Sequence, residues 1–170
     1  MNPNVSSEPS VKEKSQTKIN VINFYRERDA YGFCSNFYKA PIIIDDIEYP
    51  TTEHYFQAMK FATTDTKYMK KIIDAAGPGE SARLGRNRSH PLRPDWEEIK
   101  DDIMRKALLA KFTQHPSLKK QLLATHDSYL VEHTKNDRYW GDGGDGTGKN
   151  MLGKLLVELR NELLSIDRQR

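Results

Sequence analysis

Short blocks of alternating apolar and polar residues mark the first third of the chain, and apolar residues recur every three or four positions over most of the remainder. Residues 19–25 alternate as a β-strand does, and PIIIDDIEYP predicts a hairpin in which Ile42–Ile44 and Ile47–Tyr49 flank a two-residue turn. Residues 128–134 are the last strand candidate. The sequence therefore predicts an α+β fold, a predominantly helical single domain around a small antiparallel sheet.

Helical spacing, punctuated by Pro, Gly and capping residues, accounts for most of the rest. We expect helices after the capping residue Thr51, over 65–76, 79–86, 94–112 and 117–125, and from near Asn150 onward. The two longest helices each carry an apolar stripe that should pack inward. These stripes consist of Trp96, Ile99, Ile103, Ala107 and Ala110 in the first, and Leu152, Leu155, Leu156, Leu159 and Leu163 in the second.

Composition places these elements in one globular domain over 19–170, preceded by a solvated, disordered tail over 1–18. No apolar run is long enough to cross a membrane, and the tail has no export or import signal. The single cysteine, Cys34, indicates a reducing compartment, so we expect a cytoplasmic protein, with the nucleus left open. The net charge is only +3 and is dispersed, which argues against strong nonspecific nucleic-acid binding.

The helix after Thr51 combines an apolar load with several reactive side chains. At about 100° per residue, Glu53, Gln57 and Lys60 fall on one face, and Lys60 leans back toward Glu53. Periodicity alone favours a plainer interpretation, a half-buried helix whose polar face is solvated. Three further features point to a binding pocket instead.

The first feature is a loop with five glycines between Trp140 and Lys149, which precedes the last helix. Glycine lets a ligand approach the backbone, and a helix N-terminus attracts phosphate. The second is a set of aromatic residues beside polar ones, suited to stacking on a base. The third is the arginine-rich loop LGRNRSHPLR, suited to phosphate. The plain alternatives are a flexible turn, core aromatics and ordinary surface charge.

Other chemistries fit poorly. The five histidines lack metal-binding spacing, and Cys34 has no partner cysteine, so we expect neither a metal nor another cofactor. There is no nucleophile elbow of the GxSxG type. Cys34 as a nucleophile is conceivable, but a lone cysteine is more often a small core residue.

The blocks YGFCSNFYKAPIIIDDIEYPTTEHYFQAMKF, SARLGR, DWEEIKDDIMRKALLAKF and LVEHTKNDRYWGDGGDGTGKNMLGKLLVELR resemble the YbiA-like, or NADAR, family over about 23–164. The resemblance implies an N-glycosidase that hydrolyses a C1′–N bond of an N-riboside. One branch of the family removes ADP-ribose from the exocyclic amine of guanine in nucleic acid. Another acts on ribosylaminopyrimidine phosphates of riboflavin synthesis. We expect the first substrate, and keep the second as an alternative.

The resemblance and the residue chemistry together assign roles. Cleavage builds positive charge on the sugar, so Glu53 is the first choice for the catalytic carboxylate and Asp137 the second. Lys60 is the candidate for a Schiff base with the opened sugar. The expected substrate-binding residues are Asn36, Phe37, Gln57, Arg86, Trp96, Trp140, Gly141, Gly146, Gly148 and Asn150. A module that binds ADP-ribose without cleaving it would use the same pocket, and a monomer is compatible with all of these features.

Overall fold

The computed structural model describes residues 19–170, so the predicted tail lies outside the described residues. The elements follow one another as β1 (Val21–Phe24), a 3₁₀ turn (Gly32–Cys34), β2 (Ile42–Ile44), β3 (Ile47–Tyr49), α1 (Thr52–Met59), α2 (Thr66–Ile73), α3 (Pro78–Gly85), α4 (Trp96–Gln114), α5 (Pro116–Leu123), β4 (Tyr129–Glu132) and α6 (Met151–Arg168). The predicted α+β class and the dominance of helices are confirmed. Within the described residues, no helix is both long and apolar enough to span a membrane.

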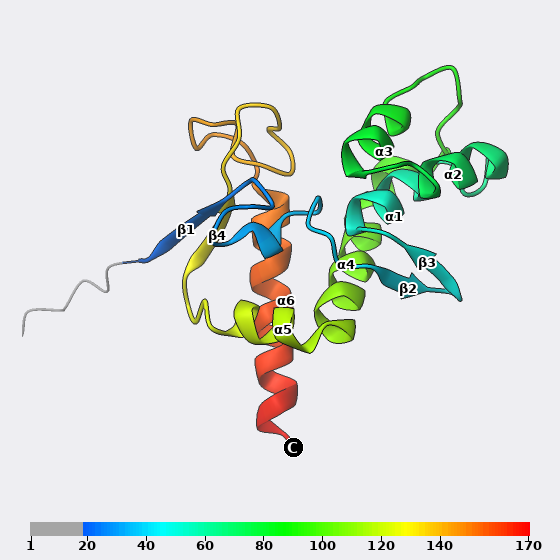
Figure 1. The fold of residues 1–170 in the computed structure, drawn as a ribbon. Coiled ribbons are helices and arrows are strands. Elements are labelled where there is room, and N and C mark those ends of the chain that lie inside the picture. Colours follow the sequence, from blue (N-terminus) through cyan, green and yellow to red (C-terminus); the bar gives the residue numbers. More distant parts are fainter. Residues whose placement is uncertain (1–18) are drawn as a thin grey trace, which may run out of the picture.

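The strands form two separate pairs. The predicted hairpin is present as the antiparallel pair β2–β3, and its turn residues Asp45 and Asp46 adopt φ angles of 52° and 63°. The second pair was not predicted: β1 lies parallel to β4, with Val21 opposite Tyr129 and Phe24 opposite Glu132. The hairpin and the helices α1 to α5 thus form the crossover between two parallel strands. In Figure 1 the β1–β4 pair flanks α6, and the hairpin lies beyond α4.

The helix boundaries differ from the predictions only where local turns intervene. Thr51 caps α1 as expected, because its hydroxyl accepts a hydrogen bond from the His54 amide at 3.2 Å. The prediction that the longest helix starts at Pro94 was wrong by two residues. The Trp96 amide donates to the Arg93 carbonyl at 3.2 Å, so a tight turn precedes α4.

Two apolar clusters share α1 and α4 as their common wall. One cluster joins β1, β4 and α6 through residues such as Phe24, Leu130 and Leu156, and the other packs the hairpin against α2 and α3. Phe56 of α1 belongs to the first cluster, whereas Ala58 belongs to the second. Every residue from Thr52 to Ala58 is consequently buried, so α1 is not the half-exposed helix that its periodicity favoured.

A buried lysine fixes the loop between β1 and β2. The side chain of Lys111 on α4 has no solvent exposure, and its Nζ donates to the Ser35 carbonyl at 2.9 Å. Burial lowers the pKa of Lys111 to about 7. Cys34 beside it is fully buried, and burial raises the pKa of its thiol to about 12, so it is a core residue rather than a nucleophile. This anchor holds residues 35–37 over the N-terminus of α1.

Candidate active site

A pocket of about 510 Å³ opens where α1 meets the end of β4. Its walls come from α1, the loop over residues 35–37, the C-terminal end of α3, and the segment 132–140 that follows β4. The volume is in the range of small-molecule sites. The apolar side chains of α1 therefore lie in the core, and polar side chains of the same helix line this pocket.

The three polar residues predicted on one face of α1 lie together in the pocket. Glu53, Gln57 and Lys60 are between 6% and 9% exposed. The Gln57 amide Nε2 donates to Glu53 Oε1 at 2.7 Å, which orients the carboxylate. Gln57 Oε1 is buried without a hydrogen-bond partner among the described residues. Gln57 itself fits only because Gly85 of α3 has no side chain, since a Cβ there would overlap the Gln57 amide.

Lys60 lies against aromatic rings rather than against water. Its Nζ is 5.3 Å from the centroid of the Phe56 ring and 5.7 Å from that of Trp96. Burial lowers the pKa of Lys60 to about 8, although Glu53 nearby acts in the opposite direction. Trp96 is buried behind Phe56 and does not line the pocket, so the structure places it as support for Lys60 instead of at the substrate.

Burial also raises the pKa of Glu53, against the opposing effects of the Gln57 hydrogen bond, Lys60 and Arg86. Arg86 follows α3 and lines the pocket from an exposed position. Lys60, Arg86 and the Gln57 amide all stabilise the charged form of the Glu53 carboxylate. The group can therefore accept a proton from a nucleophile or stabilise a cationic sugar.

The opposite wall carries two more carboxylates. Asp137 Oδ1 accepts hydrogen bonds from the Tyr139 and Trp140 amides, both at 2.8 Å. One oxygen of this carboxylate therefore stabilises the backbone of the segment after β4. Glu132 at the end of β4 lines the pocket and was missed by the sequence analysis. The available signal was its position two residues after Leu130, because a strand places both side chains on the same face.

Besides Gln57, four predicted binding residues reach the pocket from three other segments. Asn36 and Phe37 come from the anchored loop, Arg86 from the end of α3, and Trp140 from the segment after β4. Asn36 is 8% exposed and Phe37 is 37% exposed, so the first lines the interior and the second the mouth. The Trp140 ring contacts the Phe56 ring edge to face at a centroid distance of 5.3 Å. Together they provide planar surfaces above the polar wall.

The glycine-rich loop does not face the pocket. None of Gly141, Gly146, Gly148 or Asn150 lines it. The first amides of α6 are already engaged, because Asn150, Met151 and Leu152 donate to the carbonyls of Gly141, Tyr139 and Trp140 at 3.0 to 3.1 Å. The predicted phosphate site at this helix N-terminus is therefore wrong. The cations of the pocket, Arg86 and Arg26, are the groups available for a phosphate.

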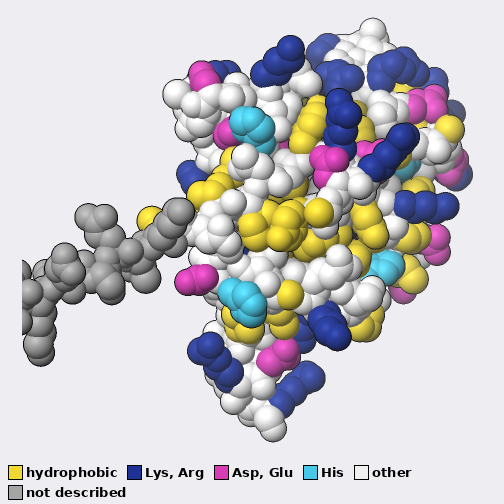
Figure 2. Space-filling model, turned by 60° about the vertical axis from the view of Figure 1, so that its left-hand side comes forward, with side chains coloured by type: hydrophobic (Ala, Val, Ile, Leu, Met, Phe, Trp, Pro, Cys, Tyr) yellow, Lys and Arg dark blue, Asp and Glu magenta, His cyan; other side chains and the backbone are white. Residues whose placement is uncertain are grey.

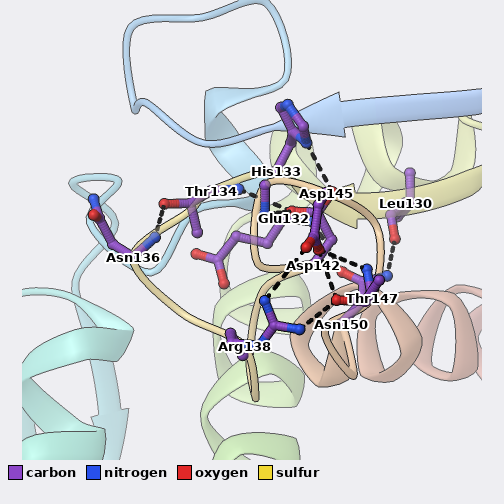
Figure 3. Close-up of polar contacts among 11 residues, drawn as sticks. Leu130, Glu132, His133, Thr134, Asn136, Arg138, Asp142, Asp145, Thr147 and Asn150 are labelled. Carbon is purple, nitrogen blue, oxygen red and sulfur yellow. Dashed lines mark hydrogen bonds and ion pairs between the residues drawn. The ribbon is translucent and has the colours of Figure 1, made fainter.

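The loop instead braces the segment after β4 from behind (Figure 3). Asp142 Oδ1 accepts from the Thr134 and Gly144 amides at 3.1 and 2.8 Å, and Asp142 Oδ2 lies 2.7 Å from His133 Nδ1. Asn150 holds β4 with its side-chain amide. Although acidic side chains converge here, no group of three or more His, Cys, Asp or Glu residues within 19–170 is arranged to hold a metal ion.

Comparisons with known proteins found a matching family model, similar sequences and a similar solved structure. The NADAR domain family model matches residues 23–164. The chain is 57% identical over 143 residues to the N-glycosidase YbiA of Shigella flexneri serotype 5b, covering 84% of this chain and 88% of that protein. It is also 40% identical to the chloroplastic riboflavin biosynthesis protein PYRR of Zea mays, covering 95% of this chain and 28% of that protein. The NMR structure of Escherichia coli YbiA superposes with a TM-score of 0.82 at 53% identity, covering 89% of each chain.

Proposed function

The chain belongs to the NADAR domain family, and from that membership and the pocket we propose that it is an N-glycosidase, a hydrolase that cleaves the C1′–N bond of an N-riboside. The observation that carries this proposal is the placement of Glu53 and Lys60 on one buried wall, with Gln57 orienting the carboxylate. Both groups can then act on one sugar carbon, and the aromatic residues above them suit the leaving base.

Two routes to bond cleavage fit this wall. In direct hydrolysis, positive charge develops on the ribose, Glu53 stabilises it, and Glu53 removes a proton from the attacking water. In the covalent route, the ribose ring opens to an imine between C1′ and the amine of the base, and the unprotonated amine of Lys60 adds to C1′. The amine of the base then takes a proton and leaves, and water hydrolyses the remaining Schiff base on Lys60. The low pKa of Lys60, about 8, supports the second route because it provides free amine near neutral pH.

We further propose that the substrate is ADP-ribose attached to the exocyclic amine of guanine in nucleic acid. Arg86 and Arg26 suit its diphosphate, and Phe37 and Trp140 suit its rings. In the view of Figure 2, Lys and Arg side chains gather along the upper edge of the face, with Asp and Glu among them. Such a mixed surface suits contact with a few nucleotides, so a single strand or an accessible end should be preferred to a long duplex.

The second candidate substrate is a ribosylaminopyrimidine phosphate of riboflavin synthesis. The maize relative, a riboflavin biosynthesis protein, favours it. This molecule shares the C1′–N bond to an exocyclic amine, but it carries one phosphate and a smaller base. It would use the same catalytic wall and leave part of the pocket empty.

The deciding experiment measures kcat/KM for both substrates with one enzyme preparation, following release of ADP-ribose or ribose phosphate by mass spectrometry. We expect release of ADP-ribose from a modified guanine oligonucleotide at the higher kcat/KM. A preference for the pyrimidine phosphate would replace the nucleic-acid substrate with the riboflavin intermediate. Saturable binding of ADP-ribose with no release from any N-riboside would instead identify a non-catalytic binding module.

A further inference from the structure

Glu132 is a pocket carboxylate that the proposed mechanism does not use. It is the last residue of β4, and it shares its strand face with Leu130, which is 1% exposed in the core. Leu130 therefore lies in the core, whereas Glu132, two residues later on the same face, lies in the pocket. Figure 3 shows the Glu132 side chain pointing away from the group of polar contacts around Asp142. Its carboxylate has no hydrogen bond to any residue that the structure describes.

The backbone of Glu132 is nevertheless held firmly. Its amide donates to Asn150 Oδ1 at 2.9 Å, and its carbonyl accepts from the Asp142 amide at 2.9 Å. Two glycines make this close packing sterically feasible. A Cβ on Gly153 would overlap the Leu130 carbonyl, and a Cβ on Gly141 would lie 2.9 Å from the Glu132 carbonyl. The fold therefore fixes the origin of this side chain while leaving its carboxyl group to the pocket.

The charges around the pocket sort its carboxylates into two kinds. Glu53 has Lys60 and Arg86 close by, which favour its charged form. The charged groups that act on Glu132 are all acidic, namely Asp137, Glu53 and Asp142. Burial, followed by these neighbours, raises the pKa of Glu132 to about 8. Burial raises the pKa of Glu53 as well, but at Glu53 the Gln57 hydrogen bond, Lys60 and Arg86 oppose that rise, whereas no cation opposes it at Glu132. Two carboxyl groups in such different environments are the usual arrangement for an acid and a base in one site.

The geometry points to Glu132 as the general acid of this site, donating a proton to the leaving nitrogen while Glu53 accepts one from the nucleophile. As the C1′–N bond breaks, its electron pair moves to the nitrogen, which takes the proton of the Glu132 carboxyl. The nucleophile, either water or the Lys60 amine, bonds to C1′ and loses a proton to Glu53. Solvent returns that proton from Glu53 to Glu132 before the next turnover. This role rests on the proposed N-glycosidase activity but not on the identity of the base.

The test compares Glu132→Gln with the wild type and with Glu48→Gln, a change at an exposed glutamate of the hairpin. The side chain of Glu132 makes no hydrogen bond within the described residues, so the Gln variant should fold normally, which thermal denaturation checks. We expect kcat/KM to fall by roughly 10²-fold or more, the usual contribution of a general acid. The fall of activity above about pH 8 in the wild type should disappear in the variant. The control should match the wild type in both respects.

A leaving-group series separates acid catalysis from mere positioning. For an N-riboside whose leaving group departs without protonation, Glu132→Gln should lose far less activity than it loses on the amine substrate. An equal loss on both substrates, or an unchanged alkaline limb in the variant, would overturn the assignment.

A titration that needs no substrate keeps the inference testable even if the proposed activity fails. The protein labelled with ¹³C in glutamate carboxyls is followed by NMR, and the Glu132 signal is identified by its absence in Glu132→Gln. We expect that signal to titrate near pH 8. Titration near the ordinary value of 4.5 would exclude a Glu132 carboxyl that is protonated at neutral pH. If the carboxyl titrates near pH 8 but the enzyme cleaves neither N-riboside, the proposed substrates have failed. The protonated Glu132 carboxyl would then still be established.

Discussion

The amine of Lys60 should be trapped on the sugar during turnover, and the structure gives the pH dependence of that trapping. A pKa of about 8 leaves about one Lys60 amine in ten unprotonated at pH 7, whereas the ordinary value of 10.5 would leave about one in three thousand. Burial of Lys60 thus increases the free nucleophile about 300-fold at neutral pH.

The assay adds a borohydride reductant during cleavage of the N-riboside and measures the labelled peptide by mass spectrometry. The adduct should reside on Lys60, and its rate of formation should rise with pH up to about pH 8 as the Lys60 amine loses its proton. Lys60→Arg keeps the positive charge but cannot form an imine, so it should give no adduct and little turnover. Lys67→Arg, at an exposed lysine of α2, should behave as the wild type does.

Three results would refute this reasoning. An active wild type that yields no adduct at any pH would leave direct hydrolysis through an oxocarbenium ion as the mechanism. Normal turnover by Lys60→Arg would reduce the role of this residue to electrostatics. A trapping rate that keeps rising beyond pH 10 would show instead that burial does not lower the pKa of this lysine.

Three further predictions concern the same pocket. Glu53→Gln keeps the helix and the size of the side chain, so turnover should fall by roughly 10²-fold or more with little change in Tm; equal activity would exclude the role of Glu53. Gly85→Ala should displace the Gln57 amide from Glu53, so kcat should fall strongly while Tm falls only a little. A kinetic comparison with Gly79→Ala, where a Cβ meets nothing within 4 Å, checks this. The raised pKa of Glu132 means that the contribution of its protonated carboxyl to the stability of the wild type is fully present below about pH 4.5 and is lost progressively as pH rises to about 8. The Tm of Glu132→Gln relative to wild type should therefore increase over that window, and a constant difference would contradict the raised pKa.

Local signals in the sequence predicted the local structure well. The stripe of leucines on α6, the cap at Thr51 and the hairpin around Asp45 and Asp46 each depend on neighbouring residues, and each is confirmed. The parallel pairing of β1 with β4 joins positions more than a hundred residues apart, as in Val21 and Tyr129. No local pattern encodes that pairing, because a four-residue strand carries too little information to choose a partner.

The same distinction between local and long-range information applies to the candidate site. Helical spacing alone grouped Glu53, Gln57 and Lys60, and they do lie together. Glu132 could be placed beside them only after the position of β4 was known. The glycine-rich loop was misinterpreted because composition does not reveal where backbone amides point. In the fold the amides of Gly143 and Gly148 donate to the carbonyls of Asp137 and Asp142, and the loop supports the site without entering it.

The side chain of Asn150 has a consequence for self-association. Its Nδ2 donates to the Leu130 carbonyl at 2.9 Å and its Oδ1 accepts from the Glu132 amide at 2.9 Å, which are the positions that a third strand would occupy. An unprotected strand edge is a template for pairing with another chain. Together with the Asp142 amide, which donates to the Glu132 carbonyl, the Asn150 side chain therefore closes this edge of β4 against extended peptides, including a second copy of the protein. Loss of Asn150 would free two of these edge positions for pairing with another chain.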